Sequence, residues 1–273
     1  EDDIYSAVWT GAALARSVDI VGRPRVRLRL SADAPQGQIC VRLNHVHPDG
    51  ASTRVSFAVL NLTHRNGAAN PEPMPVGEVQ ALELELDHIA YRVPEGHRLA
   101  VAVSSAYWPL IWPAPEAARL VVHGGALELP ERALAQADEW RFEPAEGAAG
   151  WQTEELRAPR NEKHVSTDHE TGLVTLTIND DFGKRRDRAH GLVSGGVSRE
   201  TWVIHPEDPL SARGITHWTE ETEREGLALR TETFAEMRCD REMFYLTGRL
   251  EAYENDVLVS ARDVSEHVPR DMM

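Results

Sequence analysis

The stretch HRLAVAVSSAYWPLIWPAP, residues 97–115, sets the expectation for the rest of this 273-residue chain. It begins as a strand, because Leu99, Val101 and Val103 alternate with small side chains. The alternation then stops, and residues 107–115 mix aromatic side chains with three prolines. Neither a helix nor a central strand tolerates prolines at this spacing. We therefore predict a core strand that runs into a stiff loop, residues 107–115, called the aromatic loop below.

The aromatic loop holds the candidate functional residues, namely Tyr107, Trp108, Ile111 and Trp112. Three roles are open for it: a plug packed on the chain's own core, an interface with another domain or subunit, or a platform that contacts a ligand. Aromatic side chains on a stiff loop are common in interface hot spots. We predict these four residues as interface or substrate-cleft residues, beside an apolar patch on the surface.

Period-two strands continue on both sides of this stretch. RVRLRL (residues 25–30), QICVRLNHV (38–46) and ALELEL (81–86) each alternate apolar and polar side chains. In the second of these we expect Ile39, Val41 and Leu43 to point inward and Cys40, Arg42 and Asn44 to point outward.

Two of the outer faces carry opposite charge. One is basic, with Arg25, Arg27 and Arg29, and the other is acidic, with Glu83, Glu85 and Asp87. If the two strands are neighbours, these side chains form cross-strand ion pairs. If they are not, each face is independently solvated, and the sequence leaves both arrangements open.

The spacing of the strands predicts an all-β chain with no long helix. Residues 1–135 read as a jelly-roll β-sandwich of the galactose-binding-like type. Residues 136–160, rich in Ala, Glu and Gly, read as a linker, and residues 161–273 as an antiparallel β-meander extension. Within the extension, Val174, Leu176 and Ile178 share a strand face, and DDFGKRRDRAHGLVSGGVSRE (180–200) is expected to be a charged loop.

Composition narrows the class of partner. The chain has 29 Lys and Arg against 44 Asp and Glu, a formal charge of −15, which argues against nucleic acid and against an anionic membrane surface. It has no apolar run near 18 residues and no signal-peptide pattern. Cys40 and Cys239 lie far apart, which favours two reduced thiols and a cytoplasmic protein. Because residue 1 is Glu, we expect a piece of a longer polypeptide.

Catalytic and metal-binding patterns are weak in this sequence. No serine lies in a G-x-S-x-G elbow, and the nearest string, GLVSG (191–195), has the wrong spacing. His45 and His47 share a strand face at i, i+2, but two ligands alone are weak evidence of a metal site. His97 is expected to satisfy backbone groups at a strand end. We predict no catalytic residue, no metal site and no cofactor.

Several strings resemble, in order, the C-terminal β-domain of the cocaine esterase-like (CocE/NonD) hydrolases, which are similar to X-Pro dipeptidyl-peptidases and α-amino acid ester hydrolases. They are VRLNHVHPDGASTRV (41–55), VLNLTHR (59–65), PEPMPVGE (71–78) and HIAYRVPEGHRLAVAVSSAYWPLIWPAP (88–115). The resemblance covers roughly residues 12–130. GLVTLTINDDFG (172–183), HPEDPLSARG (205–214) and HVPRD (267–271) resemble the carboxy-terminal extension of longer members.

The resemblance implies a division of labour. In this family a separate upstream α/β-hydrolase domain carries the Ser-His-Asp triad, and the jelly roll packs on it and helps wall the substrate cleft. No triad residue can be carried onto this chain, so we expect the chain alone to be inactive. Its expected partners are the upstream α/β-hydrolase domain of the same polypeptide and, in a homo-oligomer, a second copy. The rival hypotheses are a carbohydrate-binding jelly-roll module and a stand-alone oligomerisation module.

Overall fold

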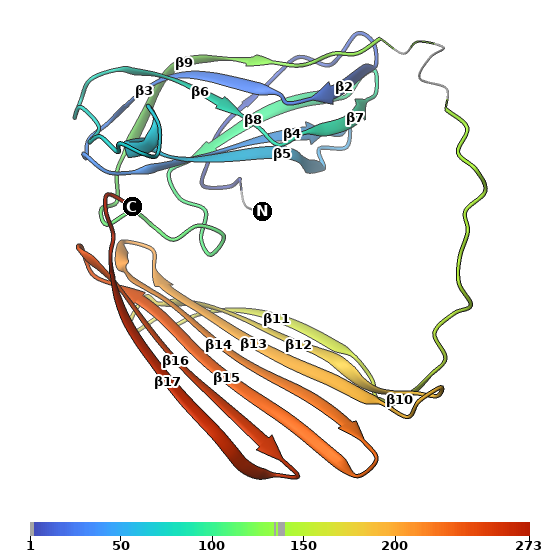
Figure 1. Ribbon diagram of the computed structural model, residues 1–273. Coiled ribbons are helices and arrows are strands. Elements are labelled where there is room, and N and C mark those ends of the chain that lie inside the picture. The colour runs from blue at the N-terminus through green and yellow to red at the C-terminus, as the bar shows by residue number, and fades with distance from the viewer. Residues whose placement is uncertain (1–2, 134, 136–139) are drawn as a thin grey trace. The chain divides into compact units, whose positions relative to one another are not determined.

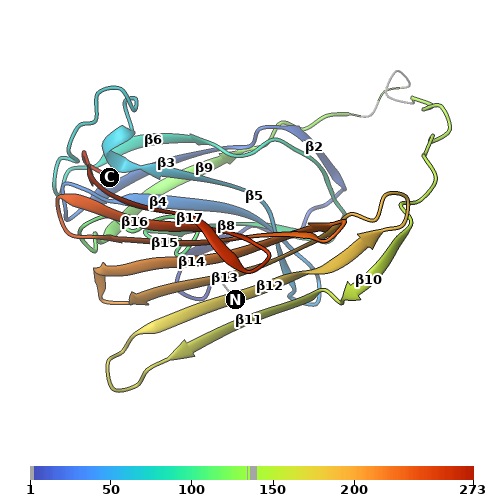
Figure 2. The ribbon, with the colours of Figure 1, turned by 60° about the horizontal axis from the view of Figure 1, so that its bottom comes forward.

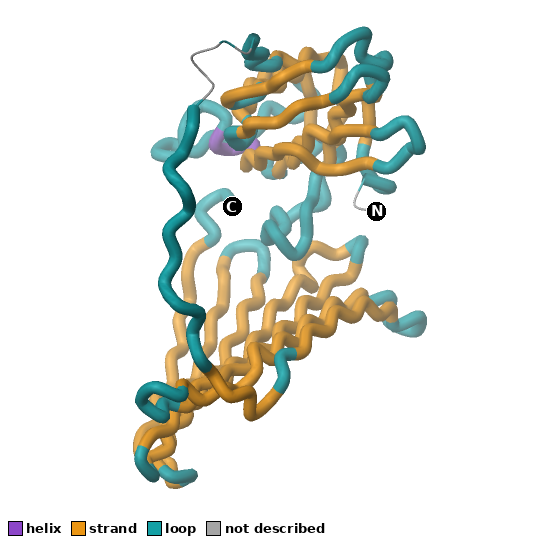
Figure 3. The backbone as a smooth tube through the Cα atoms, turned by 90° about the vertical axis from the view of Figure 1, so that its right-hand side faces the viewer, coloured by secondary structure: helices purple, strands orange, loops and turns teal. Residues whose placement is uncertain are grey.

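The computed structural model describes residues 3–133, 135 and 140–273, and nearly all of its regular structure is β-strand (Figures 1 and 3). Within these residues the helical structure is one short 3₁₀ turn, η1 (Leu62–His64). The chain forms two compact units: unit 1 comprises Glu1–Glu143 with Met272–Met273, and unit 2 comprises Pro144–Asp271. The prediction of an all-β chain is confirmed.

Unit 1 is a β-sandwich. A four-stranded antiparallel sheet, in the order β1-β8-β4-β5, and a three-stranded sheet, β6-β3-β9, supply its two layers, and β2 pairs with β7 (Figure 1). The strands are β1 (Ala7–Thr10), β2 (Val18–Gly22), β3 (Arg25–Ala32), β4 (Gln38–Val46), β5 (Ser52–Asn61), β6 (Gln80–Glu85), β7 (Ile89–Val93), β8 (Arg98–Ser104) and β9 (Leu120–Glu128). The core joins apolar residues of both layers, such as Leu28 and Leu30 of β3 with Val41 and Leu43 of β4. The sandwich prediction is therefore confirmed.

Strand β4 differs from the expectation in one respect. Cys40, Arg42 and Asn44 do lie on the face opposite the core, but they are only 1%, 2% and 3% exposed. The reason is that β4 is a central strand between β5 and β8, and residues of the N-terminal segment, Asp3 and Ser6, contact this face. These three side chains point outward from the core as predicted, but this outer face is covered and not exposed to solvent.

The basic and acidic faces belong to neighbouring strands. Strand β3 pairs with β6, so that Arg25 lies opposite Glu85 and Arg27 opposite Glu83. Arg25 and Glu85 approach to 2.6 Å, and Arg27 and Glu83 to 2.8 Å. Of the two arrangements that the sequence left open, the structure has the cross-strand ladder.

Unit 2 is a single eight-stranded antiparallel sheet. The path β10-β12-β13-β14-β15-β16-β17 follows chain order apart from β11, which also pairs with β12 (Figure 2). The strands are β10 (Thr153–Arg157), β11 (Arg160–Thr167), β12 (Val174–Asp187), β13 (Val193–His205), β14 (Asp208–Arg224), β15 (Leu227–Cys239), β16 (Met243–Glu254) and β17 (Val257–Pro269). The antiparallel meander is confirmed, and β10 falls inside the span expected to be a linker.

The segment expected to be a charged loop, residues 180–200, is instead strand. Strand β12 continues to Asp187 and β13 begins at Val193, so only a short turn separates them. The charges fit a sheet because they pair across it: Lys184 approaches Glu221 to 3.1 Å, and Arg186 approaches Glu154 to 2.8 Å. The loop prediction is wrong, because a high density of charged residues is compatible with a strand when the charges pair with neighbouring strands.

The register gives the sheet of unit 2 two different faces. Leu176, Trp202, Gly214, Met237 and Leu246 lie opposite one another in a row that crosses five strands. Since side chains alternate along a strand, the residues between them form the other face. That face carries ion pairs such as Arg213 with Glu236, 2.7 Å apart. The first face also carries Glu200 and Glu266, and the second carries Ile215, so apolar and charged residues occur on both faces.

Two further features concern the whole described chain. No helix within residues 3–133, 135 and 140–273 is long and apolar enough to cross a membrane. Within the same residues, neither Cys40 nor Cys239 takes part in a disulfide bond, and both are buried.

Candidate functional site

The aromatic loop leaves the end of β8, as the sequence predicts. Its residues 107–111 form a turn in which the backbone amide of Ile111 donates to the carbonyl of Tyr107, 2.9 Å away. The indoles of Trp108 and Trp112 meet edge to face, with ring centroids 5.3 Å apart and an interplanar angle of 76°. Tyr107, Trp108, Ile111 and Trp112 are all partly buried, whereas Leu110 is 60% exposed. The four predicted residues thus lie together on one loop, and their role as an interface stays a prediction.

The loop is fixed at its root by two arginines of the sandwich. The guanidinium of Arg42 (β4) lies over the Tyr107 ring, 4.8 Å from its centroid. Arg54 (β5) donates a hydrogen bond to the Tyr107 hydroxyl, and its guanidinium also lies over the Phe57 ring, at 4.8 Å. Cation–π contacts of this kind contribute about 0.5–2 kcal/mol, more when the pair is desolvated. The start of the loop is therefore positioned by the sheet beneath it.

Arg42 is the centre of a buried polar network. Its Nε donates to Asp3 Oδ1 at 2.8 Å, one Nη donates to Ser104 Oγ at 3.1 Å, and the other donates to Ser6 Oγ at 2.5 Å. A buried guanidinium is tolerated only when it is paired and hydrogen-bonded in this way. The network links the N-terminal segment, β4 and the last residue of β8, from which the aromatic loop departs.

A polar cavity of about 810 Å³ lies beside this network, with Arg42, Asn44, Arg54 and Tyr107 among its lining residues. The lining combines guanidinium groups with an amide and a phenol, which suits the binding of polar groups better than it suits bond cleavage. Ser52 also lines it, and no histidine is among the described residues that do. The cavity is a groove at the root of the aromatic loop.

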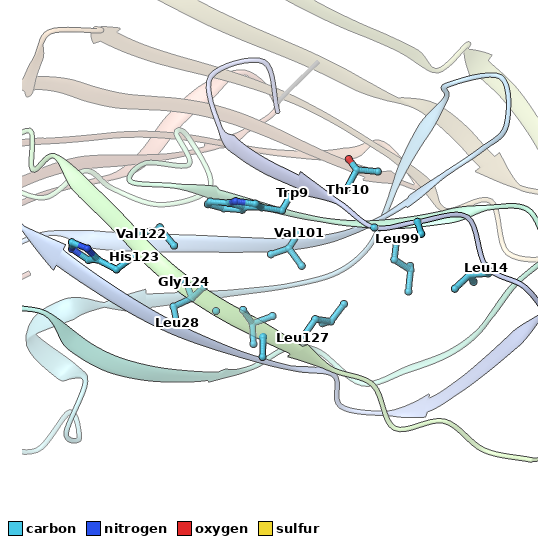
Figure 4. Close-up of a pocket in the computed structure, with 15 residues that line it drawn as sticks. Trp9, Thr10, Leu14, Leu28, Leu99, Val101, Val122, His123, Gly124 and Leu127 are labelled. Atoms are coloured by element: carbon cyan, nitrogen blue, oxygen red, sulfur yellow. The ribbon is translucent and has the colours of Figure 1, made fainter.

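An apolar cavity of about 620 Å³ lies between the two layers of the sandwich (Figure 4). Trp9 and Val101 line it from β1 and β8, and Leu28 and Leu127 line it from β3 and β9. Gly125 permits this arrangement, because a Cβ there would lie 2.6 Å from the carbonyl oxygen of Arg27. Strand β9 therefore approaches β3 closely at the edge of the cavity.

One serine–histidine contact lies at the edge of this apolar cavity. Ser31 Oγ lies 2.9 Å from His123 Nε2. A nucleophilic serine needs a base that is itself oriented by a third group, usually a carboxylate. Within the described residues no carboxylate is hydrogen-bonded to His123. The Cys40 thiol is no substitute, since burial raises its pKa and disfavours the reactive thiolate.

The structure adds a third histidine, His97, to the pair His45 and His47 that the sequence places on one strand face. His45, His47 and His97 each offer a ring nitrogen, and these nitrogens lie within 4.8 Å of one another. His45 is 3% exposed, and the other two are partly buried. Burial, followed by repulsion from His47 and His97, lowers the pKa of the His45 imidazole, so the neutral ring is favoured.

Sequence reasoning missed His97 as a member of this cluster, because it lies 50 or more residues from the other two. The signal available was register. His45 lies opposite Leu99 in the β4–β8 pair, and two residues further along each strand come His47 and His97, on the same face. Pairing β4 with β8 from sequence would have placed the three rings at one end of the sheet.

The chain is similar to proteins of a known family. The profile of the X-Pro dipeptidyl-peptidase C-terminal non-catalytic domain matches residues 1–139. The cocaine esterase of Rhodococcus sp. (strain MB1 Bresler) is 26% identical over 108 residues, which cover 40% of this chain and 18% of the esterase.

Two solved structures of hydrolases match part of this chain. An α-amino acid ester hydrolase matches with a TM-score of 0.43 and 21% identity, over 46% of this chain and 25% of the hydrolase. A CocE/NonD family hydrolase from Staphylococcus aureus matches with a TM-score of 0.40 and 14% identity, over 46% of this chain and 30% of the hydrolase. The matched region thus spans less than a third of each of these relatives.

Proposed function

Because this chain belongs to the family of X-Pro dipeptidyl-peptidase C-terminal non-catalytic domains, we propose that it is the non-catalytic region of a serine hydrolase. Its sandwich packs on an upstream α/β-hydrolase domain of the same polypeptide and helps shape the substrate cleft. The intact enzyme acts on acyl esters or on X-Pro peptides. The catalytic serine, its base and the oxyanion hole belong to the upstream domain.

The observation that carries this proposal is the aromatic loop. Its root is held by Arg42 and Arg54, while Leu110 is 60% exposed and the indoles of Trp108 and Trp112 are only partly buried. A rigid loop that presents aromatic side chains costs little conformational entropy on docking, which is typical of interface hot spots. Tyr107, Trp108, Ile111 and Trp112 are accordingly the residues that we assign to the interface with the hydrolase domain.

The arrangement of the indoles favours docking over sugar binding. A sugar ring stacks on a flat aromatic surface, whereas Trp108 and Trp112 stand nearly perpendicular, at 76°. Such a pair presents an edge and a face rather than one platform. Isothermal calorimetry against a panel of glycans is expected to give no saturable binding, and saturable binding abolished by Trp108→Ala contradicts the proposal.

The first experiment tests the division of labour. The chain by itself is expected to give no turnover of a p-nitrophenyl ester above background, since none of the residues that the structure describes forms an oriented serine nucleophile. The polypeptide that includes the upstream hydrolase domain is expected to turn the ester over and to lose this activity on labelling of its serine. Turnover by the isolated chain that is lost on serine labelling is the contrary result.

The second experiment tests the loop. With the hydrolase domain supplied as a separate chain, Trp108→Ala or Trp112→Ala is expected to weaken association about 30-fold, as for a hot-spot residue worth about 2 kcal/mol. Trp140→Ala is the matched control, because Trp140 is 74% exposed and lies outside the loop. Hydrogen exchange at residues 107–115 is expected to slow in the complex. Equal affinities for all three variants would argue against docking through this loop.

A further inference from the structure

The cluster of His45, His47 and His97 is separate from the aromatic loop, and the proposed function does not use it. The three side chains come from the end of β4 and from the turn that precedes β8. His45 pairs with Leu99 and Val46 with Arg98, so the antiparallel register brings His47 and His97 together just beyond the last pair. The cluster is therefore built into the pairing of two central strands.

The rings are close enough to share one ion. His45 Nε2 and His97 Nδ1 are 2.6 Å apart, and the rings of His45 and His47 stack with centroids 4.1 Å apart. In a tetrahedral site with metal–nitrogen bonds near 2.0–2.1 Å, ligand nitrogens lie roughly 3.3 Å apart. The His45–His97 pair needs to open by less than about 1 Å to reach this geometry.

Tyr91 of β7 orients the buried histidine of the cluster. The Tyr91 hydroxyl lies 2.7 Å from His45 Nδ1. When Nδ1–H donates to this oxygen, Nε2 is left with its lone pair directed at the cluster. Metal-bound histidines nearly always have such a partner on the second ring nitrogen, which fixes the tautomer and the ring orientation.

The backbone holds the other two histidines in place. The amide of His47 donates to the carbonyl of Ala51 at 2.8 Å, which closes the turn between β4 and β5. The amide of His97 donates to the carbonyl of Pro94 at 3.3 Å, in the turn between β7 and β8. Both side chains therefore project from closed turns, and an ion between them would tie one turn to the other.

We propose that His45, His47 and His97 bind one divalent transition-metal ion, with Zn²⁺ as the ion of choice for the test. Three imidazoles are borderline nitrogen ligands, which suit zinc and its first-row neighbours rather than Mg²⁺ or Ca²⁺. Three protein ligands leave a fourth tetrahedral position, which water fills. The ion takes the place of the hydrogen bond between His45 Nε2 and His97 Nδ1, and the proton of His97 moves to its own Nε2 so that Nδ1 can bind.

The test uses the untagged full chain after treatment with a chelator. Titration with ZnCl₂ in a calorimeter is expected to show one site per chain. Loss of a single outer partner typically costs 10- to 100-fold in affinity, so His47→Ala or His97→Ala is expected to cost at least about 10-fold, and Tyr91→Phe about 10-fold. His169→Ala is the control, because His169 is an exposed histidine of a turn in unit 2.

Two further measurements make the result decisive. Co²⁺ in place of Zn²⁺ is expected to give the intense visible absorption of a tetrahedral site in the wild-type chain and in His169→Ala, and not in His97→Ala. Saturating Zn²⁺ is expected to raise the Tm of unit 1 by about 5 °C or more. Far-UV circular dichroism of the metal-free variants shows whether each is folded. If His97→Ala does not fold, His47→Ala serves as the second variant, since His47 occupies a partly buried turn position.

Two outcomes overturn the proposal. One is the absence of zinc binding at concentrations up to about 100 μM, a range in which a three-ligand site is expected to bind. The other is zinc binding that His47→Ala and His97→Ala leave unchanged, since the ion would then reside elsewhere. Neither outcome bears on the interface proposed for the aromatic loop, because the two sites share no residue.

Discussion

Unit 1 and unit 2 are both antiparallel β structures, yet they shelter their apolar side chains in different ways. In unit 1 two sheets cover each other, and the hydrophobic core of the described chain, from Val18 to Val103, lies entirely within it. Unit 2 forms one sheet, and few of its described apolar side chains are buried, among them Val193 and Phe244. Two-layer packing removes apolar surface from water on both sheets at once, whereas a single sheet has no second sheet to cover either of its faces.

The two units differ in the interactions that stabilise their folded states. Leu43 of β4 is completely buried, so its apolar contacts contribute through the hydrophobic effect and close packing. In unit 2, Glu221 of β14 accepts hydrogen bonds from Arg157 at 2.8 Å and from Lys184 at 3.1 Å. We infer that unit 1 depends chiefly on its core, and unit 2 on strand register and paired charges.

The largest effect is expected from a cavity in the core of unit 1. Leu43→Ala removes a fully buried side chain from a central strand and is expected to lower the free energy of unfolding of unit 1 by about 3 kcal/mol. Leu250→Ala in unit 2, where Leu250 is 41% exposed, is expected to cost less than about 1 kcal/mol. Urea unfolding followed by hydrogen exchange in β4 and β16 separates the two units, and equal costs would remove the contrast.

A medium effect on stability is expected from the ion pairs that Glu221 forms with Arg157 and Lys184 in unit 2. Burial raises the pKa of the Glu221 carboxyl, but the hydrogen bonds from Arg157 and Lys184 outweigh it and hold the pKa below the ordinary value of 4.5. A lowered pKa in the folded state means that the stabilisation is complete above pH 4.5 and is lost as the pH falls through the folded-state pKa. Glu221→Gln is therefore expected to destabilise unit 2 by about 1–2 kcal/mol at pH 7, and by less as the pH falls through the folded-state pKa.

The pH dependence has its own control. Unfolding of unit 2 is measured from pH 7 to pH 3 for the wild-type chain, Glu221→Gln and Glu170→Gln, where Glu170 is an exposed residue of the β11–β12 turn. The wild-type and Glu170→Gln curves are expected to coincide, and the Glu221→Gln curve to be flatter. A Glu221→Gln curve parallel to the wild-type curve would show that this carboxylate does not contribute through its charge.

The smallest effect is expected from the ion-pair ladder on unit 1. Arg27 and Glu83 are 2.8 Å apart, but about half of each side chain is exposed, at 53% and 46%. Exposed pairs contribute little because water and salt screen them. Glu83→Gln is expected to change the Tm by less than about 2 °C, and less still in 1 M NaCl. A change as large as that of Leu43→Ala would mean that the ladder, rather than the core, holds β3 to β6.

Much of the fold could be read from single strands. The alternation in residues 25–30 and 81–86 placed Val26, Leu28, Leu82 and Leu84 in the core, and all four are buried. The prolines after β8 correctly ended that strand and predicted a loop. The charge density of residues 180–200 wrongly predicted a loop, because Lys184 and Arg186 have their partners on other strands, Glu221 of β14 and Glu154 of β10. The burial of Arg42 could not be predicted for a similar reason, since the residues that contact it, Asp3 and Ser6, lie in a distant part of the sequence.

The sequence by itself determined the alternation, and with it the all-β class, the strand faces and the position of the aromatic loop. These are local properties, fixed by side chains two residues apart and by proline at the loop. Only the tertiary structure decided which strands are neighbours. That choice depends on contacts between residues far apart in the chain, so it alone created the Arg27–Glu83 pair, the burial of Arg42 and the meeting of His45, His47 and His97.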